Sequence, residues 1–185
     1  NEAEGIHYTI EALAAQKDRD FELVFVDNAS TDGTANVIRT ACQSLSLDYE
    51  IVHEPQKGTG AAADTGFRYA IANGAVIIAR TDADTSPAQD WIGQVKSGFS
   101  VGLEFMGGPL RLRTDSIRPN LLDRIFVPFT LWIGITYGKL FYRGKQFKYP
   151  FFMAAGNNMA ITADLYRRAG GFKRISIAEG NEDSM

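Results

Sequence analysis

Two aspartates separated by one residue, Asp82 and Asp84, follow a short apolar run that is typical of a buried strand. In extended backbone, side chains two residues apart point to the same side, so the two carboxylates can converge on one target. Mg²⁺ commonly binds one or two protein carboxylates and completes its shell with water and phosphate oxygens. The pair is therefore a candidate metal site. The alternative is a turn that leads into a helix capped by Ser86 and starting at Pro87.

Other polar residues follow the ends of predicted strands. Asp27 comes directly after the strand predicted for residues 21–26, and Lys57 comes shortly after the strand predicted for residues 49–53. Strands and helices alternate along this part of the chain, which favours an α/β fold with a parallel sheet and helices on both faces. Such sheets bind ligands beyond the carboxyl ends of their strands. We therefore expect Asp27, Lys57 and Asp82 to lie at one edge.

Hydrophobic periodicity predicts the remaining elements. They are an amphipathic helix within residues 1–16, helices around residues 37–45, 60–72, 91–95 and 163–168, and strands at residues 75–79 and 103–106. An α/β domain normally has a strand before its first helix, so we expect the natural protein to continue beyond both ends of this sequence.

The composition restricts the class of protein. The chain has 185 residues, of which 45% are hydrophobic and 22% charged, as is ordinary for a soluble globular domain. Its net charge of -3 gives no support to a nucleic-acid partner. Cys42 is the single cysteine, so an internal disulfide is excluded, and its apolar neighbours predict a buried thiol in a reducing, cytoplasmic setting. The longest uncharged run, residues 125–138, is too short to span a membrane.

Several segments together resemble the inverting glycosyltransferases of family 2, which have the GT-A fold. In chain order they are Asn1-Glu2, residues 26–34, Lys57-Gly58, Asp82-Ala83-Asp84, Gly156-Asn157-Asn158-Met159-Ala160, Gly170-Gly171-Phe172 and Glu182-Asp183. The resemblance covers nearly the whole chain. It implies an α/β, GT-A (nucleotide-diphospho-sugar transferase) fold with a mostly parallel central sheet flanked by helices and a Rossmann-like nucleotide-binding half. Residues 1–185 would form a single domain, truncated at both ends, with a nucleotide-sugar-binding half at 1–100 and an acceptor-binding half at 101–185.

The resemblance also implies a role for individual residues. Those that would bind the nucleotide sugar are Glu2, Asp27, Asn28, Lys57, Asp64, Asp82 and Ala83. A Mg²⁺ or Mn²⁺ ion on the diphosphate would be held by Asp84 and Asp82. The donor sugar or the acceptor would be lined by Gly156, Asn157 and Asn158. Glu182 and Asp183 would form the catalytic acidic pair, with Asp183 as the general base that deprotonates the acceptor hydroxyl.

The implied reaction is inverting transfer of a sugar from a nucleoside-diphosphate sugar, expected to be a UDP-sugar, to a hydroxyl of a saccharide or lipid-linked acceptor. The setting would be cell-envelope or polysaccharide biosynthesis in the cytoplasm or at the cytoplasmic face of the membrane. The aromatic-rich residues 126–152 are typical of core packing, and the alternative is that part of them contacts a lipid-linked acceptor or makes a peripheral membrane contact.

Alternatives remain open. The loop Gly58-x-Gly60-x-x-Ala63 imitates a dinucleotide-binding fingerprint, which would suit a nicotinamide-dependent oxidoreductase. A nucleotidyltransferase could use the same carboxylate pair and would release pyrophosphate. A non-catalytic binding module is the third alternative.

Overall fold

The computed structural model describes residues 1–108, 129, 132–134, 136–137, 140 and 156–172. The chain divides into two compact units, one of Asn1–Met106 with Gly156–Met185 and one of Gly107–Ala155. The first unit thus takes residues from both of the halves expected from the sequence, and the functional division into those halves stays a prediction. Among the described residues, no helix is both long enough and apolar enough to cross a membrane.

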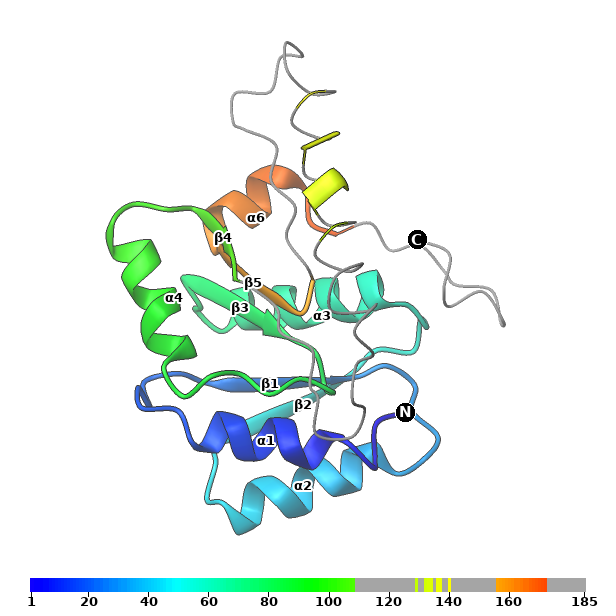
Figure 1. Cartoon of the computed structure of the whole chain (residues 1–185). Helices are drawn as coiled ribbons and strands as arrows, with labels where there is room; N and C mark the ends of the chain where they lie inside the picture. Colours follow the sequence, from blue (N-terminus) through cyan, green and yellow to red (C-terminus); the bar gives the residue numbers. More distant parts are fainter. Residues whose placement is uncertain (109–128, 130–131, 135, 138–139, 141–155, 173–185) are drawn as a thin grey trace. The chain divides into compact units, whose positions relative to one another are not determined.

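Helices and strands alternate through the first half of the chain, as predicted (Figure 1). The described elements are α1 (Ile6–Ala14), β1 (Leu23–Asp27), α2 (Thr34–Ser44), β2 (Tyr49–His53), α3 (Thr59–Ala72), β3 (Ile77–Thr81), α4 (Trp91–Ser100), β4 (Phe105–Gly107), β5 (Asn158–Thr162) and α6 (Ala163–Ala169). The hydrophobic pattern therefore located each of these elements except β5, for which no strand was predicted, with boundaries displaced by a few residues.

The strands form two sheets. β1 and β2 are parallel, and their register sets Asp27 opposite His53. The second sheet has the order β3-β5-β4, and β5 is antiparallel to β3 with Asn158 opposite Thr81. The α/β fold class is confirmed, but the described strands combine a parallel and an antiparallel pair, because β5 runs back beside β3. This return brings the start of β5 to the end of β3.

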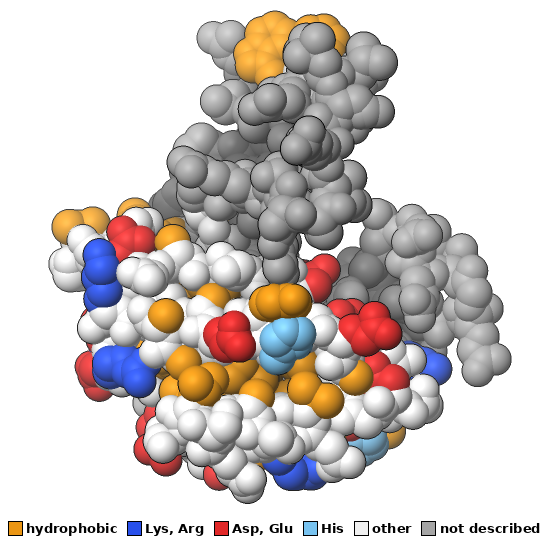
Figure 2. Space-filling view, turned by 60° about the horizontal axis from the view of Figure 1, so that its bottom comes forward, with side chains coloured by type: hydrophobic (Ala, Val, Ile, Leu, Met, Phe, Trp, Pro, Cys, Tyr) orange, Lys and Arg blue, Asp and Glu red, His pale blue; other side chains and the backbone are white. Residues whose placement is uncertain are grey.

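A hydrophobic cluster lies between α1, α2 and the first sheet. Ile6 and Ile10 of α1 meet Ile38 and Cys42 of α2, each pair being four residues apart and so on one helix face. Figure 2 looks onto this side and shows apolar side chains gathered on its surface. Cys42 is fully buried, and burial raises the pKa of its thiol. The predicted buried thiol is therefore confirmed.

The helix predicted to start at Pro87 begins instead at Trp91. The side chain of Gln16, which is buried, donates to the carbonyl of Ala88 over 2.8 Å and accepts from the backbone N–H of Ile92 over 3.1 Å. These bonds hold the segment after β3 alongside α1, so α4 starts three residues later than Ala88. Sequence signals for capping could not reveal this tertiary contact.

Candidate functional site

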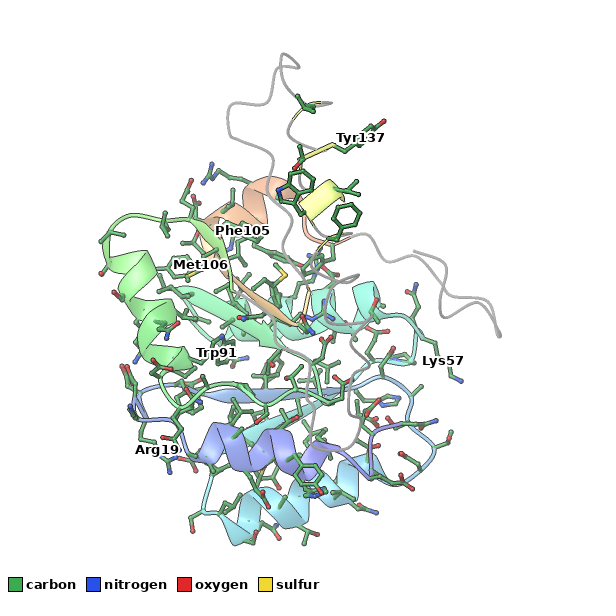
Figure 3. All side chains as sticks on the ribbon, viewed as in Figure 1. Arg19, Lys57, Trp91, Phe105, Met106 and Tyr137 are labelled. Atoms are coloured by element: carbon green, nitrogen blue, oxygen red, sulfur yellow. The ribbon has the colours of Figure 1, made fainter. Side chains whose placement is uncertain are left out.

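The carboxyl ends of β1, β2 and β3 lie on the same side of the first unit (Figure 1). Asp27 is the last residue of β1, and Asp82 directly follows β3. Lys57 follows β2 by four residues; it is exposed, and its side chain points away from the ribbon (Figure 3). This is the edge at which ligands of α/β sheets bind.

Asp27 is held by two neighbours at this edge. Its Oδ1 accepts from the backbone N–H of Ser30 over 3.2 Å, and its Oδ2 lies 3.5 Å from Nδ1 of His53. Partial burial acts to raise the pKa of Asp27, but hydrogen bonds from Ser30 and then His53 outweigh it, so the pKa is lowered. Asp27 is therefore an ionised acceptor at neutral pH.

Asn28 organises the loop between β2 and α3. Its Nδ2 donates to the carbonyls of Glu54 (3.0 Å) and Gln56 (2.7 Å), and its Oδ1 accepts from the backbone N–H of Gly58 (2.8 Å). Both amide hydrogens are thus engaged within the protein, which leaves one lone pair of the oxygen. The structure gives Asn28 a positioning role toward the loop that carries Lys57, and a direct contact with a nucleotide stays a prediction.

The turn that contains Asp82 and Asp84 is fixed by a threonine of α1. The buried hydroxyl of Thr9 lies 2.7 Å from the carbonyl of Ala83 and 2.5 Å from that of Thr85. Ala83 also packs against the apolar cluster of α1 and α2. This role of Thr9 was not predicted from the sequence, although a threonine on the apolar face of an amphipathic helix indicates a buried polar contact.

Asp82 is paired with a cation that sequence analysis also missed. Its Oδ1 lies 3.0 Å from Nη2 of Arg80, two residues earlier and therefore on the same side of the strand. Gly156 lies directly against this guanidinium, since a Cβ at that position would be 3.2 Å from Nη1 of Arg80. Asp84 differs from Asp82, because it is exposed and makes no hydrogen bond or ion pair with any residue that the structure describes.

The start of β5 adds two asparagines to this edge. Asn158 lies opposite Thr81, the last residue of β3, and its Oδ1 accepts from Nε1 of Trp91 over 2.9 Å. The Oδ1 of Asn157 is buried and has no hydrogen-bond partner in the described part of the chain. A buried acceptor without a donor is rare in native proteins, and a bound water, ion or ligand group is one explanation for it. The structure thus assembles Asp82, Gly156 and Asn158 around the end of β3.

These residues fit a hard divalent cation such as Mg²⁺ or Mn²⁺. Asp82 and Asp84 offer carboxylate oxygens and Asn157 an amide oxygen, the ligand types that such ions prefer. Within the described ranges, no three His, Cys, Asp or Glu side chains form a ready-made metal cluster. The donor set therefore suits an ion whose shell is completed by a ligand's phosphate oxygens.

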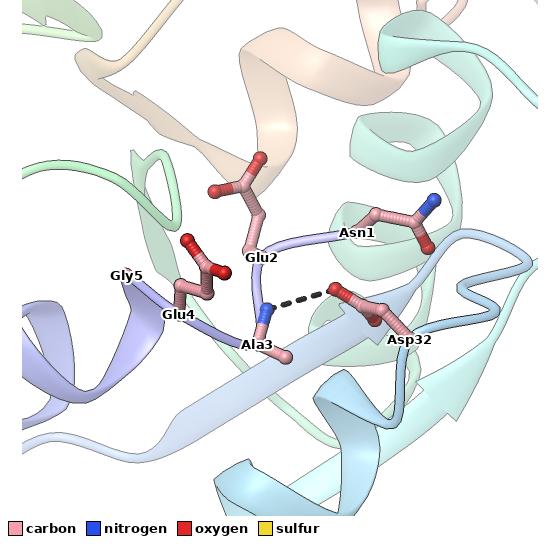
Figure 4. A pocket seen from close by; sticks show the side chains of 6 residues that line it. All are labelled: Asn1, Glu2, Ala3, Glu4, Gly5 and Asp32. Atoms are coloured by element: carbon pink, nitrogen blue, oxygen red, sulfur yellow. Dashed lines mark hydrogen bonds between the residues drawn. The ribbon is translucent and has the colours of Figure 1, made fainter.

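A cavity of about 380 Å³ adjoins the amino-terminal segment (Figure 4). It is lined by residues 1–5 and by Asp32, which accepts from the backbone N–H of Ala3 over 3.0 Å. Hydrogen bonds from Thr34 and then from Ala3 lower the pKa of Asp32 to about 2. Glu2 lines this cavity (Figure 4), and its carboxylate has no hydrogen-bond partner among the described residues.

Comparison with known proteins identifies the family of this chain. The profile described as Glycosyl transferase family 2 matches residues 1–166. The chain belongs to glycosyltransferase family 2. It is 35% identical over 114 residues to "Glycosyltransferase AglE" from Haloferax volcanii, a match that covers 58% of this chain and 36% of AglE.

Solved structures agree on the fold. The crystal structure of S. aureus TarS 1-349 matches with a TM-score of 0.60 and 15% identity, covering 94% of this chain and 48% of TarS. The same protein in complex with UDP matches with a TM-score of 0.58, also at 15% identity, covering 99% and 49%. The GT-A fold is therefore confirmed. The chain spans about a third of AglE and about half of each TarS chain.

Two of the residues expected to act in a family 2 enzyme, Glu182 and Asp183, lie outside the described residues. Asp64, which was expected to bind the nucleotide, lies in the core instead. It is 1% exposed, and its carboxylate accepts from the hydroxyl of Tyr166 over 2.6 Å and from Nε of Arg68 over 2.8 Å. Its burial gives Asp64 a structural role that ties α3 to α6.

Gly171 completes this buried network. It has a φ of +82°, and a Cβ there would lie 2.8 Å from Oδ1 of Asp64, so only glycine fits without a shift. The next residue, Phe172, donates its backbone N–H to the hydroxyl of Tyr166 over 3.2 Å. The rings of Phe67, Tyr166 and Phe172 pack around this bond with centroids 5.0 to 5.5 Å apart.

The raised pKa of Tyr166 predicts that the free energy of unfolding depends on pH. Burial and then its hydrogen bond to the Asp64 carboxylate raise the pKa of Tyr166 from 10.0 to about 12. The pKa of Tyr166 is higher in the folded state than in the unfolded state. The stabilisation of the fold by the buried phenol is therefore complete below pH 10 and is lost as the pH rises to about 12. In urea unfolding, the difference in free energy between wild type and Tyr166→Phe should shrink over this interval. A constant difference would contradict the assignment.

Proposed function

We propose that the protein is an inverting glycosyltransferase that transfers a sugar from a UDP-sugar to an acceptor hydroxyl, with Mg²⁺ or Mn²⁺ on the diphosphate. The observation that carries the proposal is the set of side-chain oxygens near the end of β3, where Asp82 and Asp84 follow one strand and Asn157, whose Oδ1 is buried, precedes the next. Asp84 has no partner among the described residues. Membership of family 2 and the likeness to a fold solved with UDP support the choice of donor.

The residues of this edge would act by binding and orientation. Asp27, ionised at neutral pH, would accept a hydrogen bond from an N–H of the base. Arg80 would hold Asp82 toward the ribose, while Asp84 would bind the cation. The cation, when bound, supplies Lewis-acid stabilisation of the departing diphosphate. Asp183 would accept the proton of the acceptor hydroxyl, and Glu182 would orient the acceptor.

The acceptor is proposed to be a hydroxyl of a saccharide or of a lipid-linked saccharide, as in cell-envelope or polysaccharide biosynthesis. We propose that the reaction takes place in the cytoplasm or at the cytoplasmic face of a membrane. Gly156, Asn157 and Asn158 would line the space between donor sugar and acceptor, where the Gly156 backbone approaches closely.

Release of UDP tests the proposal directly. A panel of UDP-sugars is incubated with the protein and Mn²⁺, with and without EDTA, and UDP and pyrophosphate are both measured. We expect metal-dependent release of UDP and, by calorimetry, binding of UDP that requires Mn²⁺. Release of pyrophosphate would favour a nucleotidyltransferase, and metal-independent binding of NADH would favour an oxidoreductase. UDP binding without turnover of any sugar would favour a binding module.

A further inference from the structure

The described residues of the second unit carry a stripe of exposed apolar side chains. The stripe consists of Phe129, Trp132, Ile133, Tyr137 and Leu140, which are 45% to 65% exposed. All five lie in helical backbone, where the hydroxyl of Thr136 donates to the carbonyl of Trp132 over 2.7 Å. At 100° per residue, the five positions fall within about 140° of the helix circumference. The spacing of the five positions is thus that of one face of a helix.

Two members of the stripe are in contact with each other. The rings of Phe129 and Trp132 are stacked with centroids 6.3 Å apart, and the side chain of Tyr137 points away from its helix (Figure 3). In the first unit, Val76 and Val101 are even more exposed but lie in separate segments. Scattered apolar residues are normal on a surface, whereas a contiguous group indicates an interaction.

The charge of the same segment indicates the kind of partner. Residues 107–155 contain eight Lys and Arg against two Asp and Glu, a net charge of +6. The rest of the chain contains eleven against twenty, a net charge of -9. Positive charge is thus concentrated in the segment that carries the stripe. Aromatic residues combined with Lys and Arg are typical of surfaces that lie in the headgroup region of anionic membranes.

We propose that the stripe is a docking surface for an anionic lipid bilayer. Trp132 and Tyr137 would lie at the headgroup level and Phe129, Ile133 and Leu140 at the acyl boundary, while the basic residues of the segment attract the surface. Docking itself follows from the stripe and its charge. Its consequence, that the enzyme meets an acceptor carried on a lipid, rests on the proposed function.

Co-sedimentation with vesicles tests the proposal. The whole chain is mixed with vesicles of phosphatidylcholine alone or of equimolar phosphatidylcholine and phosphatidylglycerol. We expect binding to the mixed vesicles that weakens with added salt and falls about tenfold or more in Trp132→Ser/Tyr137→Ser. The matched control is Val76→Ser/Val101→Ser, which removes two exposed apolar side chains of the first unit and should bind as wild type does.

Tryptophan fluorescence gives a second measurement. Mixed vesicles should shift the emission of wild type to the blue, and Trp132→Phe should lose this shift although Trp91 remains. Equal vesicle binding by the stripe variant and wild type would overturn the proposal. So would a dimer in vesicle-free solution that the stripe variant abolishes, because the stripe would then bind a second copy. UDP binding without vesicles is measured separately, so failure of docking and failure of the proposed function are distinguishable.

Discussion

Replacing Asp84 by alanine is expected to lower metal-dependent sugar transfer at least about 100-fold, the usual scale for loss of an electrostatic contact to the reacting group. Because Asp84 is exposed and has no partner among the described residues, its removal breaks no internal bond. The melting temperature should therefore not change. Initial rates of UDP release at several Mn²⁺ concentrations, with thermal unfolding of the same preparations, measure both effects.

The matched control for this substitution is Asp48→Ala. Asp48 is also exposed and without a described partner, but it precedes β2 and so lies at the opposite, amino end of the sheet. It should leave both the rate and the melting temperature unchanged. Asp84→Ala with wild-type rates and wild-type Mn²⁺ dependence would contradict the metal assignment, as would full transfer by wild type in EDTA.

Asp82→Ala is expected to differ in its effects from Asp84→Ala. Asp82 is bonded to Arg80, so its removal should reduce transfer and also release a guanidinium that lies against Gly156. The two aspartates look equivalent in the sequence, since both follow one apolar run. Their difference comes from Arg80 and is visible only once the strand direction and the return of β5 are known.

Most helices and strands could be predicted from the local pattern, because they have a strong hydrophobic period or end at a clear terminating residue. The strand at residues 49–53 matches β2, and the burial of Cys42 follows from its apolar neighbours. The start of α4 could not be predicted, because the hydrogen bonds of Gln16 to a distant segment override the signals at Ser86 and Pro87. The antiparallel β5 is likewise set by a return of the chain that has no local signature.

The sequence was enough to predict which residues of the candidate site lie at strand ends. It was not enough to predict which partners their side chains contact. Asp27 ends a strand and Asp82 and Asp84 follow one, and these strands could be predicted from the sequence. Asn28 lies in the same kind of position, yet its amide is used to hold the loop at residues 54–58. Whether a polar side chain faces a ligand or its own backbone depends on which segment packs beside it, and residue type does not carry that information.

Asp64→Ala is expected to lower the free energy of unfolding by about 3 kcal/mol, and so the melting temperature by roughly 10 °C. The substitution leaves the buried hydroxyl of Tyr166 without its acceptor and opens a void between α3 and α6. UDP affinity of the folded protein should stay within about twofold of wild type, since a buried structural carboxylate contributes nothing directly to a ligand. Urea unfolding and calorimetric titration measure the two quantities.

The chain offers an internal control for this prediction in Asp164. Asp164 and Arg168 repeat the spacing and atoms of Asp64 and Arg68, with Nε donating to Oδ2 over 2.9 Å in place of 2.8 Å. The aspartate is 74% exposed in the one pair and 1% exposed in the other. Because solvent screens an exposed pair, Asp164→Ala should lower the free energy of unfolding by only about 0.5 kcal/mol. Equal losses from the two substitutions would show that the i,i+4 ion pair, and not the buried bond to Tyr166, carries the stability. A loss of UDP affinity in Asp64→Ala with stability unchanged would instead indicate that Asp64 binds the nucleotide.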